Sequence, residues 1–318
     1  MKTIRLSLRV LVTGYMLFFY SELLFWARPR PGDSLINWLV TWLVYTLAGL
    51  AFLTAVAGFR VKSVWALFLC GALFGWLTEG IIVQTMYEAF PIQISWTGLA
   101  WHALISVMVG WLAVPLALRR DKGWLILGLA IVLGLFWGIW ALWWWAEQPE
   151  QIASPGAFTA YALFSSLLLI LAYWIDSRLS DQTFTPSKWL VAALGLFFGG
   201  LFLIGAAPAA PLAALVLPFL LGLVFLALWR SRSRETGGSL FEHPSITFPA
   251  TNFILLLAMP LTAAGVYAIS YATQIRLQAG PLIYLITTVL GFVLFGVSLV
   301  KTWRGKPDQA RQRGEGAS

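Results

Sequence analysis

Three ionisable residues stand within long apolar runs of the sequence, where a charge is costly. These are Glu22, Glu79 and His102. An ionisable side chain at the centre of a membrane helix costs roughly 2.5–3.5 kcal/mol on insertion scales, so each is a candidate site residue. A carboxylate beside an imidazole can relay protons, activate water or bind a cationic group. The sequence therefore predicts a working site at Glu79 and His102, with Glu22 as a further candidate.

The three residues are also predicted to lie at one depth. Each is 17 residues from a basic residue at the predicted cytoplasmic end of its run, namely Arg5, Lys62 and Arg119, respectively. At 1.5 Å per residue this distance is roughly 25 Å, within the outer part of a hydrocarbon core roughly 30 Å thick. Counting 17 residues back from Arg178 and from Lys301 gives Tyr161 and Tyr284, respectively. We take both tyrosines as supporting residues, although tyrosine at this depth also suits an aromatic belt. Arg28 is a third supporting residue, because Glu22 lies near the end of its predicted helix and can pair with it.

The composition requires a membrane as the solvent for most of the chain. Of the 318 residues, 60% are hydrophobic and 11% are charged, against roughly a quarter charged in a soluble domain. The net charge of +8 sits in short loops between apolar runs. That pattern is typical of topology determinants and anionic lipid contacts, not of nucleic-acid binding. Two histidines and one cysteine, Cys70 within an apolar run, make up no standard metal-ligand set, and no cofactor is expected.

The apolar runs predict an all-α polytopic protein with about ten transmembrane helices. At roughly 20 residues per span, the predicted spans are Ile4–Ala27, Leu35–Phe59, Ser63–Met86, Ile94–Leu118, Gly123–Ala146, Phe158–Ile175, Trp189–Ala206, Leu212–Trp229, Phe253–Thr273 and Pro281–Val300. The N-terminus and the C-terminus are both predicted to be cytoplasmic. Every Lys and Arg except Arg28, Arg30 and Arg276 then falls on the cytoplasmic side, as the positive-inside rule requires. The seventh and eighth spans are the hardest to separate, because the connection 207–211 is apolar.

Residues 1–303 form a single predicted transmembrane domain, for which halves 1–156 and 157–303 are an alternative division. Five helices in each half would make the halves inverted repeats, as in many transporters. Residues 304–318 are predicted to be a disordered, basic cytoplasmic tail. The predicted location is the plasma membrane of a bacterium or an archaeon, with the lipid bilayer as the main partner and the oligomeric state left open.

Small residues indicate how the site is assembled. Gly71, Gly75 and Glu79 recur at intervals of four and share one face of the third span. A second stripe runs along the fourth span: Ser95, Gly98, His102, Ser106 and Gly110. Such stripes let membrane helices approach closely, and consecutive helices normally pack together. Face to face, the stripes bring the Glu79 carboxylate and the His102 imidazole within hydrogen-bond reach. The same pair is equally interpreted as a satisfied polar contact that only joins two helices.

Further glycine pairs, Gly134 with Gly138 and Gly195 with Gly199, predict close helix contacts in the fifth and seventh spans. Tryptophans gather at the outer end of the fifth span: Trp137, Trp140, Trp143, Trp144 and Trp145. Aromatic platforms bind sugars and quaternary amines, but this cluster is more typical of an interfacial belt. The sequence contains no glycine-rich phosphate loop, no Ser/His/Asp arrangement and no paired aspartates that would hold magnesium.

The stretch from Thr78-Glu79-Gly80 to Trp101-His102-Ala103-Leu104 resembles the CAAX-protease-like membrane glutamate proteases, which place Glu and His on adjacent helices. The resemblance covers residues 78–104 and implies catalytic roles for Glu79 and His102. Thr78 stands where that family has a second Glu, and the second His motif is missing, which puts the protease chemistry in question. In length, number of spans and cytoplasmic termini, the chain is also similar to the drug/metabolite transporter class.

Three functions are consistent with the sequence. The first is a membrane-embedded enzyme that acts on a lipid or lipid-linked substrate near the extracytoplasmic face, with Glu79 and His102 as an acid–base pair. The second is a small-solute transporter that is proton-coupled through Glu79. The third is a non-catalytic assembly or scaffold protein, in which the polar layer joins helices. A lateral lipid-facing opening favours the first function, and a central cavity between halves favours the second.

Overall fold

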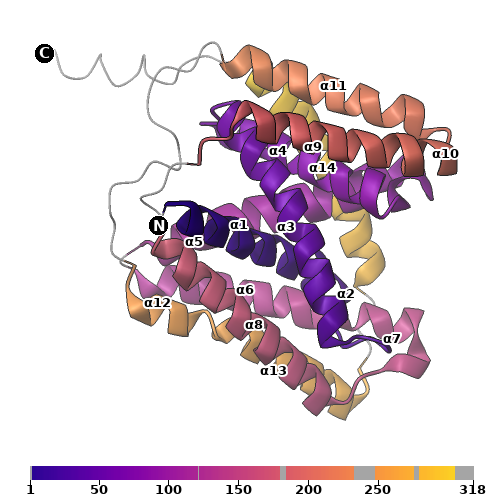
Figure 1. Ribbon diagram of the computed structural model, residues 1–318. Helices are drawn as coiled ribbons and strands as arrows, with labels where there is room; N and C mark the ends of the chain where they lie inside the picture. The colour runs from indigo at the N-terminus through magenta and orange to yellow at the C-terminus, as the bar shows by residue number, and fades with distance from the viewer. Residues whose placement is uncertain (1, 121, 180–183, 233–247, 276–278, 305–318) are drawn as a thin grey trace, which may run out of the picture.

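The computed structural model describes residues 2–120, 122–179, 184–232, 248–275 and 279–304 (Figure 1). The predicted tail, apart from its first residue, lies outside these ranges. Within them the chain is helical and contains no strand, and ten helices are long and apolar enough to cross a membrane. The protein is therefore an integral, multi-pass membrane protein, as the composition predicts.

The ten spans are built from α-helices and from π-helical segments, whose turns are wider; the label η marks both these segments and the short 3₁₀ turns. The first five contain α1 (Lys2–Phe18), η1 (Phe19–Leu23) and α2 (Leu24–Trp26); α3 (Leu35–Gly58); α4 (Val64–Leu77) and η2 (Thr78–Ile82); η4 (Ile94–Ala113) and α5 (Val114–Leu118); and α6 (Gly123–Ala141) and α7 (Trp143–Glu147). The last five contain α8 (Pro155–Ser177); α9 (Lys188–Leu201), η6 (Phe202–Ala206) and α10 (Ala207–Ala209); α11 (Ala213–Arg232); α12 (Ala250–Leu255) and α13 (Ala258–Thr273); and α14 (Gly280–Arg304). Short 3₁₀ turns, η3 (Thr85–Tyr87) and η5 (Pro149–Gln151), lie in connections.

Each predicted span matches one of the ten long apolar helices to within a few residues. The seventh and eighth are separate helices, Lys188–Ala209 and Ala213–Arg232, and each is long enough to cross. The apolar connection between them is a tight turn that begins after Ala209, the last residue of α10. The orientation of the termini and the division into halves stay predictions.

Serines fix where four of the helices begin. The hydroxyls of Ser34, Ser63, Ser154 and Ser187 each accept a hydrogen bond from the backbone N–H three residues later, at 3.1–3.2 Å. The first amides of a helix have no intrahelical acceptor, so a serine at this position satisfies one of them. The four caps begin α3, α4, α8 and α9.

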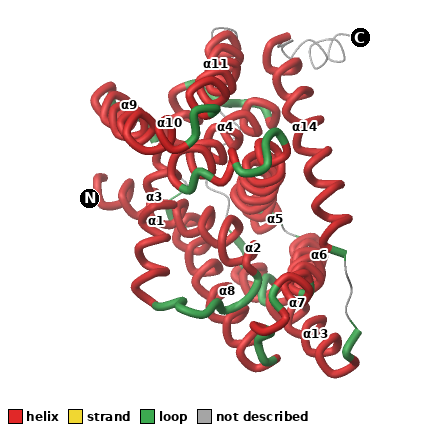
Figure 2. Tube along the Cα trace, turned by 90° about the vertical axis from the view of Figure 1, so that its right-hand side faces the viewer, coloured by secondary structure: helices red, strands yellow, loops and turns green. Residues whose placement is uncertain are grey.

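The core of the bundle is formed by α1, α4 and η4. α1 packs against α3 and α8, and η4 packs against α4 and α14. Seen along the bundle, α9 and α11 lie at one edge and α13 lies toward the other (Figure 2). α4 is mostly buried, whereas most of α9 and α14 faces outward. The peripheral helices therefore present most of their apolar surface to the surrounding lipid.

The predicted contact between the third and fourth spans is present. A Cβ atom on Gly75 would overlap the carbonyl oxygen of Gly98, so only glycine allows this approach. α6 approaches α13 in the same way through Gly134 and Gly138. Gly195 and Gly199 differ, because no atom lies within 4 Å of a Cβ built on either. The prediction of close packing is thus right for two glycine pairs and wrong for the pair in α9.

Arginine side chains gather at one end of the bundle. The guanidinium of Arg5 donates to the carbonyl oxygen of Arg178 at 3.0 Å, and Arg9 forms an ion pair with Asp176 at 3.8 Å. We call this end, which lies on the left in Figure 1 beside the N-terminus, the basic end. Glu22, Glu79 and His102 lie toward the opposite end of their helices, as the depth argument predicts.

Four spans contain π-helical segments: η1, η2, η4 and η6. In a π-helix each amide bonds to a carbonyl five residues back, and such turns occur mostly singly and often at functional sites. Here η4 continues for 20 residues. Glu22 lies in η1, Glu79 in η2 and His102 in η4. Each of the three ionisable candidates is therefore carried by a wide helical turn.

Candidate functional site

The central feature of the site is a direct contact between Glu79 and His102. The Nε2 atom of His102 lies 2.8 Å from Oε1 of Glu79, and the hydroxyl of Thr85 donates to the second oxygen, Oε2. Glu79 is 8% exposed and His102 is 2% exposed. The ring of Phe74 packs edge-on against the imidazole, with centroids 5.3 Å apart. The pair is thus shielded from bulk solvent and held by Thr85 of η3 and Phe74 of α4.

The other ring nitrogen of His102 contacts Ser21, a residue that the sequence argument did not select. The Oγ atom of Ser21 lies 2.8 Å from Nδ1 of His102 and 2.8 Å from Oγ of Ser106. Ser106 also lies 3.2 Å from the carbonyl oxygen of Trp101. Ser21, His102 and Glu79 therefore form a continuous serine–histidine–carboxylate series.

The partners restrict where the protons lie when Glu79 is ionised. A carboxylate only accepts hydrogen bonds, so Nε2 of His102 must carry the proton that points at it. With a neutral imidazole, Nδ1 is then unprotonated and accepts the hydrogen bond that Ser21 donates, and Ser106 donates to Ser21 instead of to the Trp101 carbonyl oxygen. This tautomer is assigned from the network, and it leaves the Nδ1 lone pair directed at the serine hydroxyl.

The same atoms also accommodate one more proton. If Glu79 is protonated, it donates to Nε2 of His102, Nδ1–H donates to Ser21, and Ser21 donates to Ser106. Ser106 then donates to the carbonyl oxygen of Trp101, which is already its neighbour. The three hydrogen bonds that join Glu79, His102, Ser21 and Ser106 are made in both arrangements, with their directions reversed, whereas the bond from Ser106 to the Trp101 carbonyl oxygen is made only in the second. The network can therefore take up or release a proton without leaving a buried polar group unpaired.

Glu22 lies beside this series and not within it. Its carboxylate accepts from the Tyr45 hydroxyl at 2.8 Å and from the Trp26 indole N–H at 2.9 Å. The Tyr45 ring lies 6.3 Å, centroid to centroid, from the imidazole of His102. Two carboxylates, Glu22 and Glu79, thus flank the histidine, and only Glu79 touches it.

Arg28 does not pair with Glu22, contrary to the expectation. Its guanidinium donates to the carbonyl oxygen of Gln151 at 2.8 Å and to the side chain of Gln148, and it lies over the ring of Trp144 at 5.5 Å. Burial lowers the pKa of Arg28, because desolvation penalises the charged guanidinium. Arg28 therefore fixes the connection that contains η5, and the Glu22 carboxylate is held by neutral donors.

The two supporting tyrosines are near the site but outside its hydrogen-bonded series. The Tyr161 hydroxyl donates to the carbonyl oxygen of Leu23 at 2.7 Å, next to Glu22 in η1. The ring of Tyr284 packs on Trp96, with centroids 4.7 Å apart. Their positions indicate support of the surrounding helices, and among the described residues neither forms a hydrogen bond with Glu79 or His102.

The aromatic-belt interpretation is wrong for most of the tryptophan cluster. Trp137, Trp140, Trp144 and Trp145 are buried within the bundle. The indoles of Trp140 and Trp144 both donate to the carbonyl oxygen of Phe25, near the end of α2. The last carbonyls of a helix have no intrahelical partner. Trp140 and Trp144 therefore point into the bundle because the Phe25 carbonyl oxygen accepts their indole N–H groups, and a hydropathy pattern does not reveal such an acceptor.

No protein-family model, curated protein or solved structure matches this chain. The function is therefore argued from the site itself.

Proposed function

We propose that the protein is a membrane-embedded enzyme that transfers or hydrolyses the acyl group of a lipid or lipid-linked substrate. The observation that supports this proposal is the series Ser21–His102–Glu79, with both contacts of the imidazole at 2.8 Å. A nucleophile bonded to a base, which is in turn oriented by a third group, is the arrangement that activates a hydroxyl.

In this proposal Ser21 is the nucleophile. As its Oγ atom attacks the substrate carbonyl, Nδ1 of His102 accepts the hydroxyl proton. The resulting imidazolium is stabilised by the Glu79 carboxylate at Nε2. His102 then returns the proton to the leaving alcohol or amine, and water or a second alcohol releases the acyl group from Ser21. Glu79 keeps its charge throughout.

The position of the site supports a lipid substrate. Ser21, Glu79 and His102 belong to membrane-spanning helices, so groups that arrive from the side of the bundle are those of lipids. Ser21 is 4% exposed in this structure, so the carbonyl reaches it only after a local movement. The turn η3, which closes over Glu79 through Thr85, is the element that we expect to move.

The test uses an alkyl fluorophosphonate, which reacts with activated serines by losing fluoride and leaving a phosphonyl group on Oγ. The full chain in lipid vesicles should be labelled at Ser21, as read by peptide mass spectrometry. His102→Gln should slow labelling by about 10²–10⁴-fold, the usual contribution of a general base. Ser95→Ala is the matched control, because Ser95 is a buried serine of η4 that bonds to the Thr288 carbonyl instead. Equal labelling of the wild type and Ser21→Ala would contradict the proposal.

A second candidate, a proton-coupled transporter, is favoured by the reversible proton pattern. Proton uptake at Glu79 reverses the hydrogen bonds through to Ser106 and leaves all of them made. This function needs the Glu79 proton but no nucleophile. Solute-dependent proton uptake in vesicles that survives Ser21→Ala and disappears in Glu79→Gln would replace the enzymatic proposal.

A further inference from the structure

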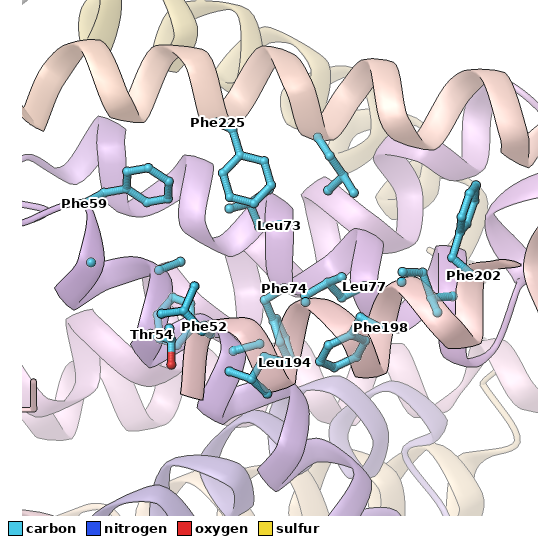
Figure 3. A pocket seen from close by; sticks show the side chains of 18 of the residues that line it. Phe52, Thr54, Phe59, Leu73, Phe74, Leu77, Leu194, Phe198, Phe202 and Phe225 are labelled. Carbon is cyan, nitrogen blue, oxygen red and sulfur yellow. The ribbon is translucent and has the colours of Figure 1, made fainter. Parts of the chain in front are cut away.

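A groove of about 560 Å³ runs between α3, α4, α9 and α11 (Figure 3). Its volume is within the roughly 300–1,000 Å³ of small-molecule sites. Aromatic and aliphatic side chains make up most of the lining, with Phe59 and Phe225 toward one end and Phe202 at the other. All four walls belong to membrane-spanning helices, so the groove lies within the hydrocarbon layer.

The glycine pair of α9 forms part of this groove. Gly195 and Gly199 line it, and a Cβ on either would meet no atom within 4 Å. The corresponding pairs in α4 and α6 are covered by a neighbouring helix, as described above. In α9 the same small-residue pattern therefore faces open space. Without side chains at Gly195 and Gly199, the surface of the helix has a depression there that is wide enough for a narrow ligand.

Two polar residues line the groove, and both lie toward the basic end. Thr54 is 9% exposed, and its hydroxyl has no hydrogen-bond partner among the described residues. Thr54 is one turn before the end of α3 at Gly58. Arg232 is the last residue of α11 and is exposed. The groove thus offers one unused hydroxyl a short way inside and one cation at its mouth.

We propose that this groove binds one acyl chain of an anionic glycerophospholipid, with the headgroup at the basic end. Arg232 pairs with the phosphate, and the Thr54 hydroxyl donates to an ester carbonyl oxygen, which lies one step deeper along a lipid than the phosphate. The chain then follows the glycine face of α9 towards Phe202. This proposal does not depend on catalysis by Ser21, which lies in the bundle toward the opposite end.

The length of the groove agrees with this occupant. Along α11 its lining runs from Arg232 to Leu217, which is roughly 22 Å at 1.5 Å per residue. One leaflet of a bilayer is about half of the roughly 30 Å core. The groove is therefore long enough to hold an acyl chain from its ester to its end. Its inner part reaches Phe74, the ring that packs on His102.

The test uses two photoactivatable probes with the same diazirine-bearing acyl chain, one with a phosphatidylglycerol and one with a phosphatidylcholine headgroup. The full chain is reconstituted in phosphatidylcholine vesicles that contain a small fraction of either probe, and crosslinked peptides are mapped. We expect adducts on the lining segments 51–58, 191–202 and 217–225. The anionic probe should be favoured by roughly fivefold, the factor for one basic residue acting on one anionic headgroup.

Variants separate the chain from the headgroup. Gly199→Phe should fill the groove and remove the adducts, whereas Gly200→Phe, on the same helix with equally open space but outside the lining, should not. Arg232→Gln should reduce the anionic probe to the yield of the neutral one, and Thr54→Val should lower both yields. Gly195→Leu serves as the smaller filler if Gly199→Phe lowers thermal stability. Equal yields of the two probes, adducts that survive both fillers, or crosslinks to a second chain in place of lipid would overturn the proposal.

Discussion

The energy that links Glu79 to His102 is directly measurable, and its two single substitutions are expected to be unequal. His102→Leu leaves the buried Glu79 carboxylate without its imidazole partner, and an uncompensated buried charge of this kind costs about 3–5 kcal/mol of unfolding free energy. Glu79→Leu leaves only neutral groups, the imidazole N–H and the Thr85 hydroxyl, so it should cost about 1–3 kcal/mol. In the double variant no charge is left at the two positions of this pair, and Ser21 still bonds to Ser106. We therefore expect the double variant to cost no more than Glu79→Leu, with a coupling energy of at least about 3 kcal/mol, the cost of His102→Leu alone.

The assay is reversible unfolding in mixed detergent micelles, followed by the fluorescence of the 18 tryptophans. A control cycle pairs Glu79→Leu with Thr302→Val, at the far end of α14, and should be additive within about 0.5 kcal/mol. Additive costs for Glu79 and His102 would refute the claim that the contact is energetically coupled. A fully stable double variant with normal phenotype would instead support the scaffold interpretation, in which the pair only joins helices.

Three further predictions follow from the packing, the pKa shift of Tyr87 and the topology. Gly75→Ala should destabilise the protein by about 1–3 kcal/mol, because the new Cβ overlaps a backbone oxygen of η4, whereas Gly199→Ala should be nearly neutral by the same unfolding assay. Burial raises the pKa of Tyr87 to about 12. The contribution of its protonated hydroxyl to the unfolding free energy should therefore be complete below pH 10 and lost as the pH rises through 12. In a series of unfolding measurements at different pH, Tyr87→Phe should not show this loss. Reporter fusions after Lys122 and Gln148 should report the cytoplasm and the opposite side, respectively, and exchanged signals would invert the topology.

The helices could be predicted from the sequence because hydropathy alone determines which segments enter a bilayer. Ile94–Leu118 is the same in the prediction and in the structure. The ends of other spans are extended by caps, as at Ser154, where the helix begins three residues earlier than its apolar run suggests. Gly195 and Gly199 show the limit of the argument. A small-residue pair indicates that something can approach closely, but not whether it is another helix.

The pairing of Glu79 with His102 could be predicted because each residue of a helix adds a fixed rise, so the number of residues from the basic end gives the depth in the membrane. Ser21 could not be found in the same way, because face arguments assume α-helical turns. Along η4 the predicted single stripe divides: Ser95 bonds to the Thr288 carbonyl of α14, whereas His102 and Ser106 contact Ser21 of η1. The wider turn of a π-helix rotates successive residues by a smaller angle than an α-helix does. Residues at α-helical spacing therefore drift onto different faces.

The wide turns also explain why aromatic donors surround the site. Backbone carbonyls within and near the π-helical segments accept side-chain hydrogen bonds: Trp101 donates to Tyr20, Tyr161 to Leu23 and Tyr173 to Gly110, at 2.6–2.8 Å. In hydrocarbon an unpaired carbonyl costs several kcal/mol, so these donors keep the irregular backbone stable. A simple polar clamp between two regular helices would need none of them. The irregular turns place Ser21 at one nitrogen of His102 while Glu79 holds the other, and the proposed acyl transfer depends on that placement.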